Sequence, residues 1–141
     1  MTRPDPDQPL NGGCHCGRVR FEVRLKEGYS QARRCNCSYC AMRGAVALTA
    51  RTEDLKVVKG ASDLTRYVFN TESAQHYFCS HCGIYTHHQR RSNPQEFGIN
   101  AACIDGLSPF DFEAVPVHDG QHHTKDGGTD EVLGVLRFDK K

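Results

Sequence analysis

Residues 35–40 read Cys-Asn-Cys-Ser-Tyr-Cys, which places three thiols within six positions. Cysteines this close together cannot form unstrained disulfides with one another, and they are too dense for ordinary packing. Two further cysteine motifs flank this stretch, because residues 14–16 read Cys-His-Cys and residues 79–82 read Cys-Ser-His-Cys. Spacings of one or two residues between thiols are typical of metal ligands. The sequence therefore predicts a fold built around three metal-binding cysteine knuckles.

The N-terminal sequence indicates a reducing compartment. Residues 1–11 alternate proline with aspartate and lack the basic start and apolar middle of a signal peptide. No apolar run approaches the roughly 18 residues that a membrane span needs. We therefore expect a cytoplasmic protein with no membrane partner. In that compartment cysteines stay reduced, so they serve as metal ligands or reactive groups and not as a disulfide framework.

Length and charge set the domain organisation and argue against one class of partner. The chain has 141 residues, enough to bury one core but not two. We predict a flexible N-terminal tail over 1–9 and a single zinc-binding domain over 10–141. Lys and Arg number 18 against 17 Asp and Glu, which gives a formal charge of +1. Such a balance supplies no global field for nucleic acid, so we expect no nucleic-acid partner.

Short strands dominate the predicted secondary structure. Apolar and polar residues alternate over 18–24 and 64–69, which is the period of a half-buried strand. Short apolar runs predict further strands at 45–49, 53–60, 76–78, 84–88 and 97–102. Two prolines restrict 109–117 to an edge strand or an extended loop. Residues 119–130 have the composition of a loop, and 132–138 fit either a strand or a short helix.

These elements predict an all-β or mainly β fold. Only 38% of the residues are hydrophobic and none is Trp, so the core is small for the length of the chain. Metal ions that pin strand ends are a sensible substitute for part of such a core.

The seven knuckle cysteines divide most simply into one closed site and one incomplete site. A structural zinc site usually combines two pairs of cysteines, which predicts one site from Cys14, Cys16, Cys79 and Cys82. The other three thiols, called the triplet below, are Cys35, Cys37 and Cys40. They can surround one face of a second zinc ion and leave its fourth position to water or substrate. A different pairing of the seven thiols is also compatible with the sequence.

The two kinds of site differ in the chemistry they support. Three thiolates donate much charge to zinc, so a bound water is polarised less than at a histidine-rich site. A thiol is the better exogenous ligand, since on zinc it becomes a nucleophilic thiolate at neutral pH. The competing interpretation is a closed second site with an internal fourth ligand, either Cys103 or one of His15, His81, His87 and His88. His87 and His88 point to opposite faces of a strand, so at most one of them binds that ion.

Arg90 and Arg91 follow these histidines. Guanidinium groups bind carboxylates in a bidentate manner, so the pair is a candidate for the carboxylates of a peptide-like thiol. The alternative is a solvated turn.

Tyr39 and Tyr85 are candidates for orienting a substrate, although aromatic residues near such knuckles more often pack around the metal. The sequence identifies no general acid or base.

Taken in order, the three motifs resemble the glutathione-dependent formaldehyde-activating enzyme family, which includes centromere protein V. The resemblance rests on Gly13 to Gly17, Cys35 to Cys40 and Phe78 to Gly83, and it covers roughly 10–119. It implies stacked antiparallel sheets, with a structural zinc on Cys14, Cys16, Cys79 and Cys82. A second, catalytic zinc is implied on Cys35, Cys37 and Cys40. Residues 84–88, Ile-Tyr-Thr-His-His, depart from the usual family pattern and indicate a subgroup.

The leading functional hypothesis is a zinc-dependent carbon-sulfur lyase with two zinc ions per chain. Its substrate is an adduct of glutathione or a related thiol with an aldehyde, such as S-hydroxymethylglutathione. One alternative is a non-catalytic zinc module that binds a protein partner. Another is a redox sensor in which oxidation of the triplet releases zinc. The oligomeric state is left open by the sequence.

Overall fold

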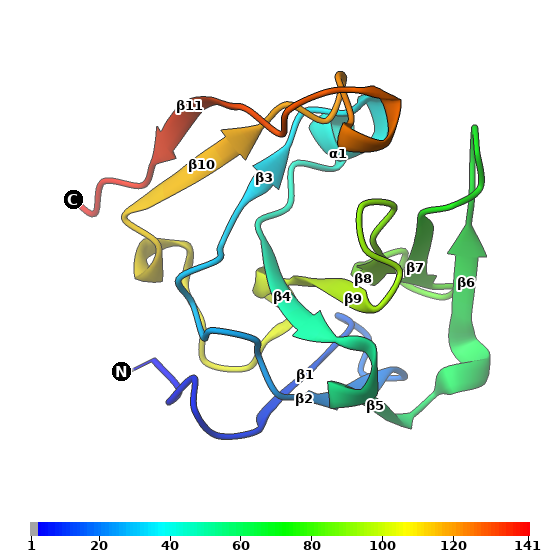
Figure 1. The fold of residues 1–141 in the computed structure, drawn as a ribbon. Coiled ribbons are helices and arrows are strands. Elements are labelled where there is room, and N and C mark those ends of the chain that lie inside the picture. Colours follow the sequence, from blue (N-terminus) through cyan, green and yellow to red (C-terminus); the bar gives the residue numbers. More distant parts are fainter. Residues whose placement is uncertain (1–2) are drawn as a thin grey trace.

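The described part of the chain, residues 3–141 of this computed structural model, forms three β-sheets (Figure 1). The first sheet has the order β1-β2-β5 and is antiparallel. Its strands are β1 (Leu10–Gly13), β2 (Arg20–Val23) and β5 (Leu55–Lys59). Phe21 and Val23 of β2 are buried, whereas Glu22 between them is exposed. The alternation in the sequence therefore correctly predicted a half-buried strand.

The second sheet is the largest and has the antiparallel order β4-β9-β8-β7-β6. Its strands are β4 (Ala47–Arg51), β9 (Glu96–Asn100), β8 (Tyr85–Gln89), β7 (Gln75–Cys79) and β6 (Leu64–Tyr67). Each of them overlaps a strand that the sequence predicted. The turn between β7 and β8 contains the third cysteine knuckle.

The third sheet has the order β11-β10-β3, with β11 (Val132–Arg137), β10 (Ala114–His118) and β3 (Arg34–Cys35). The prediction of an edge strand or loop over 109–117 was wrong, because β10 lies in the middle of this sheet. Its proline is tolerated there because Pro116 pairs only with β11. The parallel pairing with β3 begins one residue later, at Val117. Residues 132–137 form a strand, which decides between the two structures that the sequence allowed.

One α-helix, α1 (Ser38–Arg43), lies within the described residues. It ends at Gly44, which adopts the left-handed conformation at φ 66°. The sequence did not reveal this helix because it has only six residues and none of them is buried, so it carries no apolar stripe. Short 3-10 helices occupy Thr52–Asp54, Ala61–Asp63, Ala101–Cys103, Pro109–Asp111 and Thr124–Asp126.

The main hydrophobic core joins all three sheets. Phe21 of β2, Leu48 of β4, Ile99 of β9 and Val115 of β10 belong to one buried cluster. A second, smaller cluster consists of Val19 with two cysteines of the outer knuckles. The mainly β fold is therefore confirmed.

Part of the predicted tail lies against the rest of the chain. The Tyr29 hydroxyl donates a hydrogen bond of 2.7 Å to the carbonyl of Pro4, and the Arg3 guanidinium lies over the Tyr29 ring. Residues 1 and 2 are outside the described residues, and the division into 1–9 and 10–141 stays a prediction. Within residues 3–141, no helix has the length and apolar character to cross a membrane.

Candidate functional site

The structure brings the four outer cysteines into one group, called the outer cluster: Cys14, Cys16, Cys79 and Cys82. Two come from the turn between β1 and β2, and two from the end of β7 and the turn that follows. Their four Sγ atoms lie within 4.8 Å of one another, which is close enough for all four to bind one ion. The outer cluster therefore ties the first sheet to the second.

Backbone N–H groups donate hydrogen bonds to sulfur atoms of the outer cluster. The backbone N–H of Val19 donates to Cys14 Sγ at 3.3 Å, and that of His81 donates to Cys79 Sγ at 3.4 Å. The backbone amide of Cys16 lowers the pKa of Cys82 to about 6. Hydrogen bonds from backbone N–H groups favour thiolate, which is the form that binds zinc. At Cys79 the backbone N–H groups of Cys82 and His81 act in this direction, but burial and the neighbouring thiols of Cys16 and Cys82 outweigh them and raise its pKa to about 11. Four cysteine sulfurs are a usual ligand set of a closed zinc site, and the outer cluster fits such a site.

The triplet lies where β3 meets α1, and its three Sγ atoms also lie within 4.8 Å of one another. Cys35 ends β3, Cys37 is the N-cap of α1, and Cys40 lies inside the helix. The Cys40 N–H donates to Cys37 Sγ at 3.3 Å, and the Cys37 N–H donates to Cys35 Sγ at 3.4 Å. The local backbone therefore turns the three sulfurs toward a common point.

The charges of the triplet also fit a metal ion. Hydrogen bonds from Cys35 and Cys40 hold the pKa of Cys37 far below its ordinary value. The same interactions raise the pKa values of Cys35 and Cys40. On their own, the three side chains therefore favour one thiolate shared among three sulfurs. A dication at their centre would let all three ionise, so the donor set matches zinc.

No fourth His, Cys, Asp or Glu ligand atom joins the triplet among residues 3–141. The best internal candidate was Cys103, but its thiol is buried and lies 3.2 Å from the carbonyl of Tyr85 as a hydrogen-bond donor. His81 is bound to Asp63 at 2.9 Å. His87 packs against other aromatic rings. The structure therefore favours three protein ligands at this centre over a closed site.

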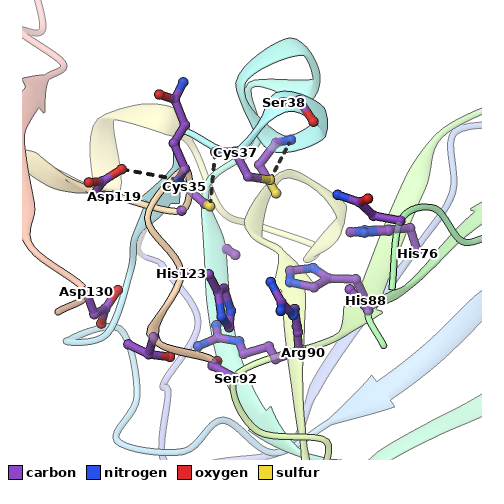
Figure 2. Close-up of a pocket in the computed structure, with 18 of the residues that line it drawn as sticks. Cys35, Cys37, Ser38, His76, His88, Arg90, Ser92, Asp119, His123 and Asp130 are labelled. Atoms are coloured by element: carbon purple, nitrogen blue, oxygen red, sulfur yellow. Dashed lines mark hydrogen bonds between the residues drawn. The ribbon is translucent and has the colours of Figure 1, made fainter. Parts of the chain in front are cut away.

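A pocket of about 490 Å³ opens beside the triplet (Figure 2). Its lining comes from four parts of the chain, within 33–47, 69–76, 88–92 and 119–130. This volume lies within the usual range of small-molecule sites. The outer cluster does not line it. Of the two candidate metal centres, only the triplet faces a pocket that can hold a substrate.

The sequence analysis predicted a loop over 119–130, but it did not predict that this loop lines the pocket. Asn36, between two cysteines of the triplet, accepts hydrogen bonds at Oδ1 from the backbone N–H groups of Gly120 (2.7 Å) and Gln121 (3.2 Å). Figure 1 shows this segment, in orange, passing beside α1. A Cβ atom at Gly120 would collide with Cys35 Sγ. The only signal in the sequence was a glycine, which has many other uses.

The arginines of the pocket differ in their partners. Arg91 is held by two hydrogen bonds to Asp126, at 2.8 and 2.7 Å, and Arg33 contacts Asp130 at 3.1 Å. Arg90 lies in the pocket wall and has no carboxylate partner among residues 3–141. Its Nε is buried without a hydrogen-bond partner, and burial lowers the pKa of its guanidinium. A half-buried cation without a carboxylate partner is a candidate binding point for an anion.

Two side chains that the sequence analysis did not single out, Arg43 and His76, complete this wall of the pocket. Arg43 Nη2 donates to Cys40 Sγ at 3.2 Å, and its Nη1 lies 2.9 Å from His76 Nδ1. The Arg43 guanidinium also lies over the ring of Tyr85, 3.7 Å from its centroid. Tyr39 packs against His76, as expected of an aromatic residue beside a knuckle. Nothing in the local sequence distinguishes these two residues.

The fold and the site together define a small, mainly β protein with two candidate cysteine metal centres, one of which faces a pocket. Residues 9–118 match the family described as glutathione-dependent formaldehyde-activating enzyme. The chain belongs to this family, as its three motifs predicted.

Two known proteins are similar to this chain. A Halomonas elongata protein whose name assigns it to the same family is 37% identical over 81 residues, which cover 52% of this chain and 51% of that protein. The chain thus spans about half the length of this curated relative. A crystal structure of a Rhodobacter sphaeroides protein is 56% identical, with a TM-score of 0.75. It covers 77% of this chain and 99% of its own.

Proposed function

We propose that this protein forms and cleaves the carbon-sulfur bond between a peptide thiol, such as glutathione, and an aldehyde, such as formaldehyde. The product in the synthetic direction is S-hydroxymethylglutathione. The observation that carries the proposal is a three-thiol centre at the wall of a pocket of about 490 Å³, which also contains Arg90, an arginine with no carboxylate partner in the described part of the chain. The name of the family supports the same substrates.

Each centre has a different proposed role. The outer cluster would hold a structural zinc, and Cys35, Cys37 and Cys40 would hold a catalytic zinc. Zinc bound to the triplet supplies the acidity that converts a thiol into a thiolate at neutral pH. The protein itself orients the substrate, because the triplet and Arg90 both line the pocket. Arg90 would bind a carboxylate of the peptide thiol through its planar, bidentate donors.

The surroundings of the triplet support an enzyme over a non-catalytic zinc module. A module that uses zinc only to hold its fold needs closed sites, and among residues 3–141 only the outer cluster offers four candidate ligand atoms. A substrate thiol can reach the triplet through the pocket, whereas the outer cluster, although its Cys16 is exposed, does not line this pocket.

The proposal can be tested with protein that carries two equivalents of zinc. Exchange NMR measures how fast glutathione and formaldehyde interconvert with S-hydroxymethylglutathione. We expect the wild-type protein to accelerate the interconversion and Cys37→Ser to abolish the acceleration. The matched control is Cys103→Ala, which removes a thiol that lies outside both clusters and should leave the rate unchanged. A wild-type rate equal to the rate without protein would contradict the proposed function.

A further inference from the structure

Two histidine side chains lie together in the wall of the pocket. His76 of β7 and His88 of β8 are cross-strand neighbours, and their rings stack with centroids 5.3 Å apart. Both residues line the pocket that the triplet faces. Figure 2 shows the His88 ring extending from its strand into this pocket, with His76 beside it. The proposed function so far uses neither of them.

The proton on the His76 ring is placed by Arg43. A guanidinium group has only N–H donors, so the contact of 2.9 Å means that His76 Nδ1 accepts a hydrogen bond. Burial lowers the pKa of His76 to about 4, so the ring is neutral at pH 7. A neutral ring that accepts at Nδ1 carries its proton on Nε2. This Nε2–H donor is buried, and it has no hydrogen-bond partner in the described chain.

The proton on the His88 ring is placed by Tyr85. The Tyr85 hydroxyl lies 2.6 Å from His88 Nδ1 and 3.3 Å from the carbonyl of Gly98. The hydroxyl has one proton. At 3.3 Å the contact with the carbonyl is longer than an ordinary O–H···O hydrogen bond, so we assign the proton to the contact with the nitrogen. Burial, together with the charges of Arg43 and Arg90, lowers the pKa of His88 well below its ordinary value. This ring too is therefore neutral, and its proton lies on Nε2.

We propose that His76 and His88 form a binding subsite for the oxygen atom of the thiol-aldehyde adduct, with both rings donating from Nε2–H. His88 is the main donor because it is half-buried at the pocket wall, whereas His76 is buried and is the second donor. This assignment rests on the proposed function and extends it to a part of the site that no metal ligand occupies. It accounts for two features at once: a buried donor without a partner, and two rings whose acceptor nitrogens are already used inside the protein.

The bond changes balance without a further reactant. In synthesis, an electron pair on sulfur forms the sulfur-carbon bond, and the π pair of the carbonyl moves to its oxygen. That oxygen becomes an alkoxide and accepts hydrogen bonds from the two Nε2–H groups. It then takes a proton from water, which replaces the proton that the thiol released to solvent. The rings keep their protons throughout, so they act as fixed donors toward developing negative charge.

His87 provides a matched control on the same strand. Its ring stacks on Tyr77 at 4.7 Å and packs edge-on against Phe97 at 5.0 Å, and it does not line the pocket. Its Nδ1 lies 2.9 Å from the hydroxyl of Thr86. His87 and His88 are thus adjacent imidazoles on opposite faces of one strand, His87 buried and His88 half-buried, and His88 is the one that lines the pocket.

The first test is the position of the two ring protons. Nitrogen-15 NMR of the wild-type protein should show both His76 and His88 as neutral Nε2–H tautomers at pH 7. Tyr85→Phe should change the nitrogen shifts of His88 and leave those of His76 in place. An Nδ1–H tautomer for His88 in the wild type would overturn the proposal, whatever the activity of any variant.

The second test is kinetic and uses zinc-loaded protein with glutathione and formaldehyde. We expect His88→Phe to lower kcat by about 10² while KM for glutathione changes little, because one donor to the developing alkoxide is lost. His88→Gln restores an N–H group and should recover part of the rate, and His76→Phe should give a smaller loss. His87→Phe should keep kcat. Normal turnover by His88→Phe in an active protein would overturn this assignment alone, whereas an inactive wild type would overturn the proposed function with it.

Discussion

Two groups of cysteines in this chain have the same ligand chemistry and different surroundings. The outer cluster has four thiols, draws them from two sheets, and lies against a small apolar cluster around Val19. The triplet draws three thiols from six consecutive residues and faces a pocket. The comparison shows that the function of a cysteine metal centre depends on the chain that it closes and the space that it faces.

The two centres join residues that are different distances apart in the sequence. We therefore expect metal ions in the two centres to contribute differently to the stability of the fold. An ion in the outer cluster links Cys16 to Cys79 and so closes a long loop of chain, which removes much of the entropy of the unfolded state. An ion in the triplet orders only a short segment between β3 and α1. We therefore attribute most of the metal-dependent folding energy to the outer cluster.

The largest predicted effect separates the two centres directly. Cys79→Ser removes a fully buried ligand of the outer cluster, so we expect the protein to lose its folded structure. Cys37→Ser should stay folded and lose activity. Circular dichroism and zinc content per chain measure both outcomes. Equal unfolding of the two variants would show that the centres do not have separate roles.

A smaller effect is predicted for Arg90, the cation that distinguishes the pocket of the triplet. Arg90→Gln should raise KM for glutathione by roughly tenfold or more, because a bidentate bond to a carboxylate is lost. The free energy of unfolding should not fall, since the half-buried guanidinium has no carboxylate partner among residues 3–141.

Glutathione dimethyl ester, which has no free carboxylate, is the matched probe for this prediction. The wild type should bind the ester as weakly as Arg90→Gln binds glutathione, and Arg90→Gln should not distinguish the two ligands. An unchanged KM for glutathione in Arg90→Gln would remove Arg90 from the proposed binding site.

A third prediction concerns the loop that covers the triplet. Gly120→Ala places a methyl group against Cys35 Sγ, so zinc should leave the triplet faster while the outer cluster keeps its ion. Gly134→Ala is the control, because a methyl group there meets nothing within 4 Å. Zinc release to a coloured chelator measures both variants. Identical release curves for Gly120→Ala and Gly134→Ala would mean that the loop can shift to make room for the methyl group without weakening zinc binding.

The smallest effect is expected from the ion pair that anchors the same loop. Asp126→Asn removes the negative charge and one of the two hydrogen bonds from Arg91. The Asp126 side chain is 59% exposed. Exposed pairs contribute little, so we expect KM for glutathione to rise by about threefold and zinc content to stay at two. Steady-state kinetics decides this, and a change of tenfold or more would mean that Arg91 itself binds substrate.

The sequence predicted the parts of the molecule that depend on local pattern. Alternation placed β2 and β6, short apolar runs placed the other strands of the large sheet, and thiol spacing identified the knuckles. The same reasoning put His87 and His88 on opposite faces of one strand. These features follow from residues close together in the chain, where the period of the backbone decides the outcome.

The pocket could not be predicted because its parts meet only in the folded chain. Arg90 and Arg91 are adjacent and chemically alike, yet Asp126, 35 residues away, pairs with one of them and leaves the other available. The proposed role of His76 depends on its contact with Arg43, which is 33 residues away in the sequence. The central place of β10 depended on a two-residue pairing with β3, which leaves no periodic signal.

The most direct test of the central claim follows the spectrum of cobalt in place of zinc as glutathione is added. We predict two cobalt ions per chain and a rise in sulfur-to-cobalt charge-transfer absorption that corresponds to one added thiolate. This rise should be absent in Cys37→Ser. A spectrum that does not change at saturating glutathione would mean that the triplet accepts no external sulfur, and the proposed chemistry would be wrong.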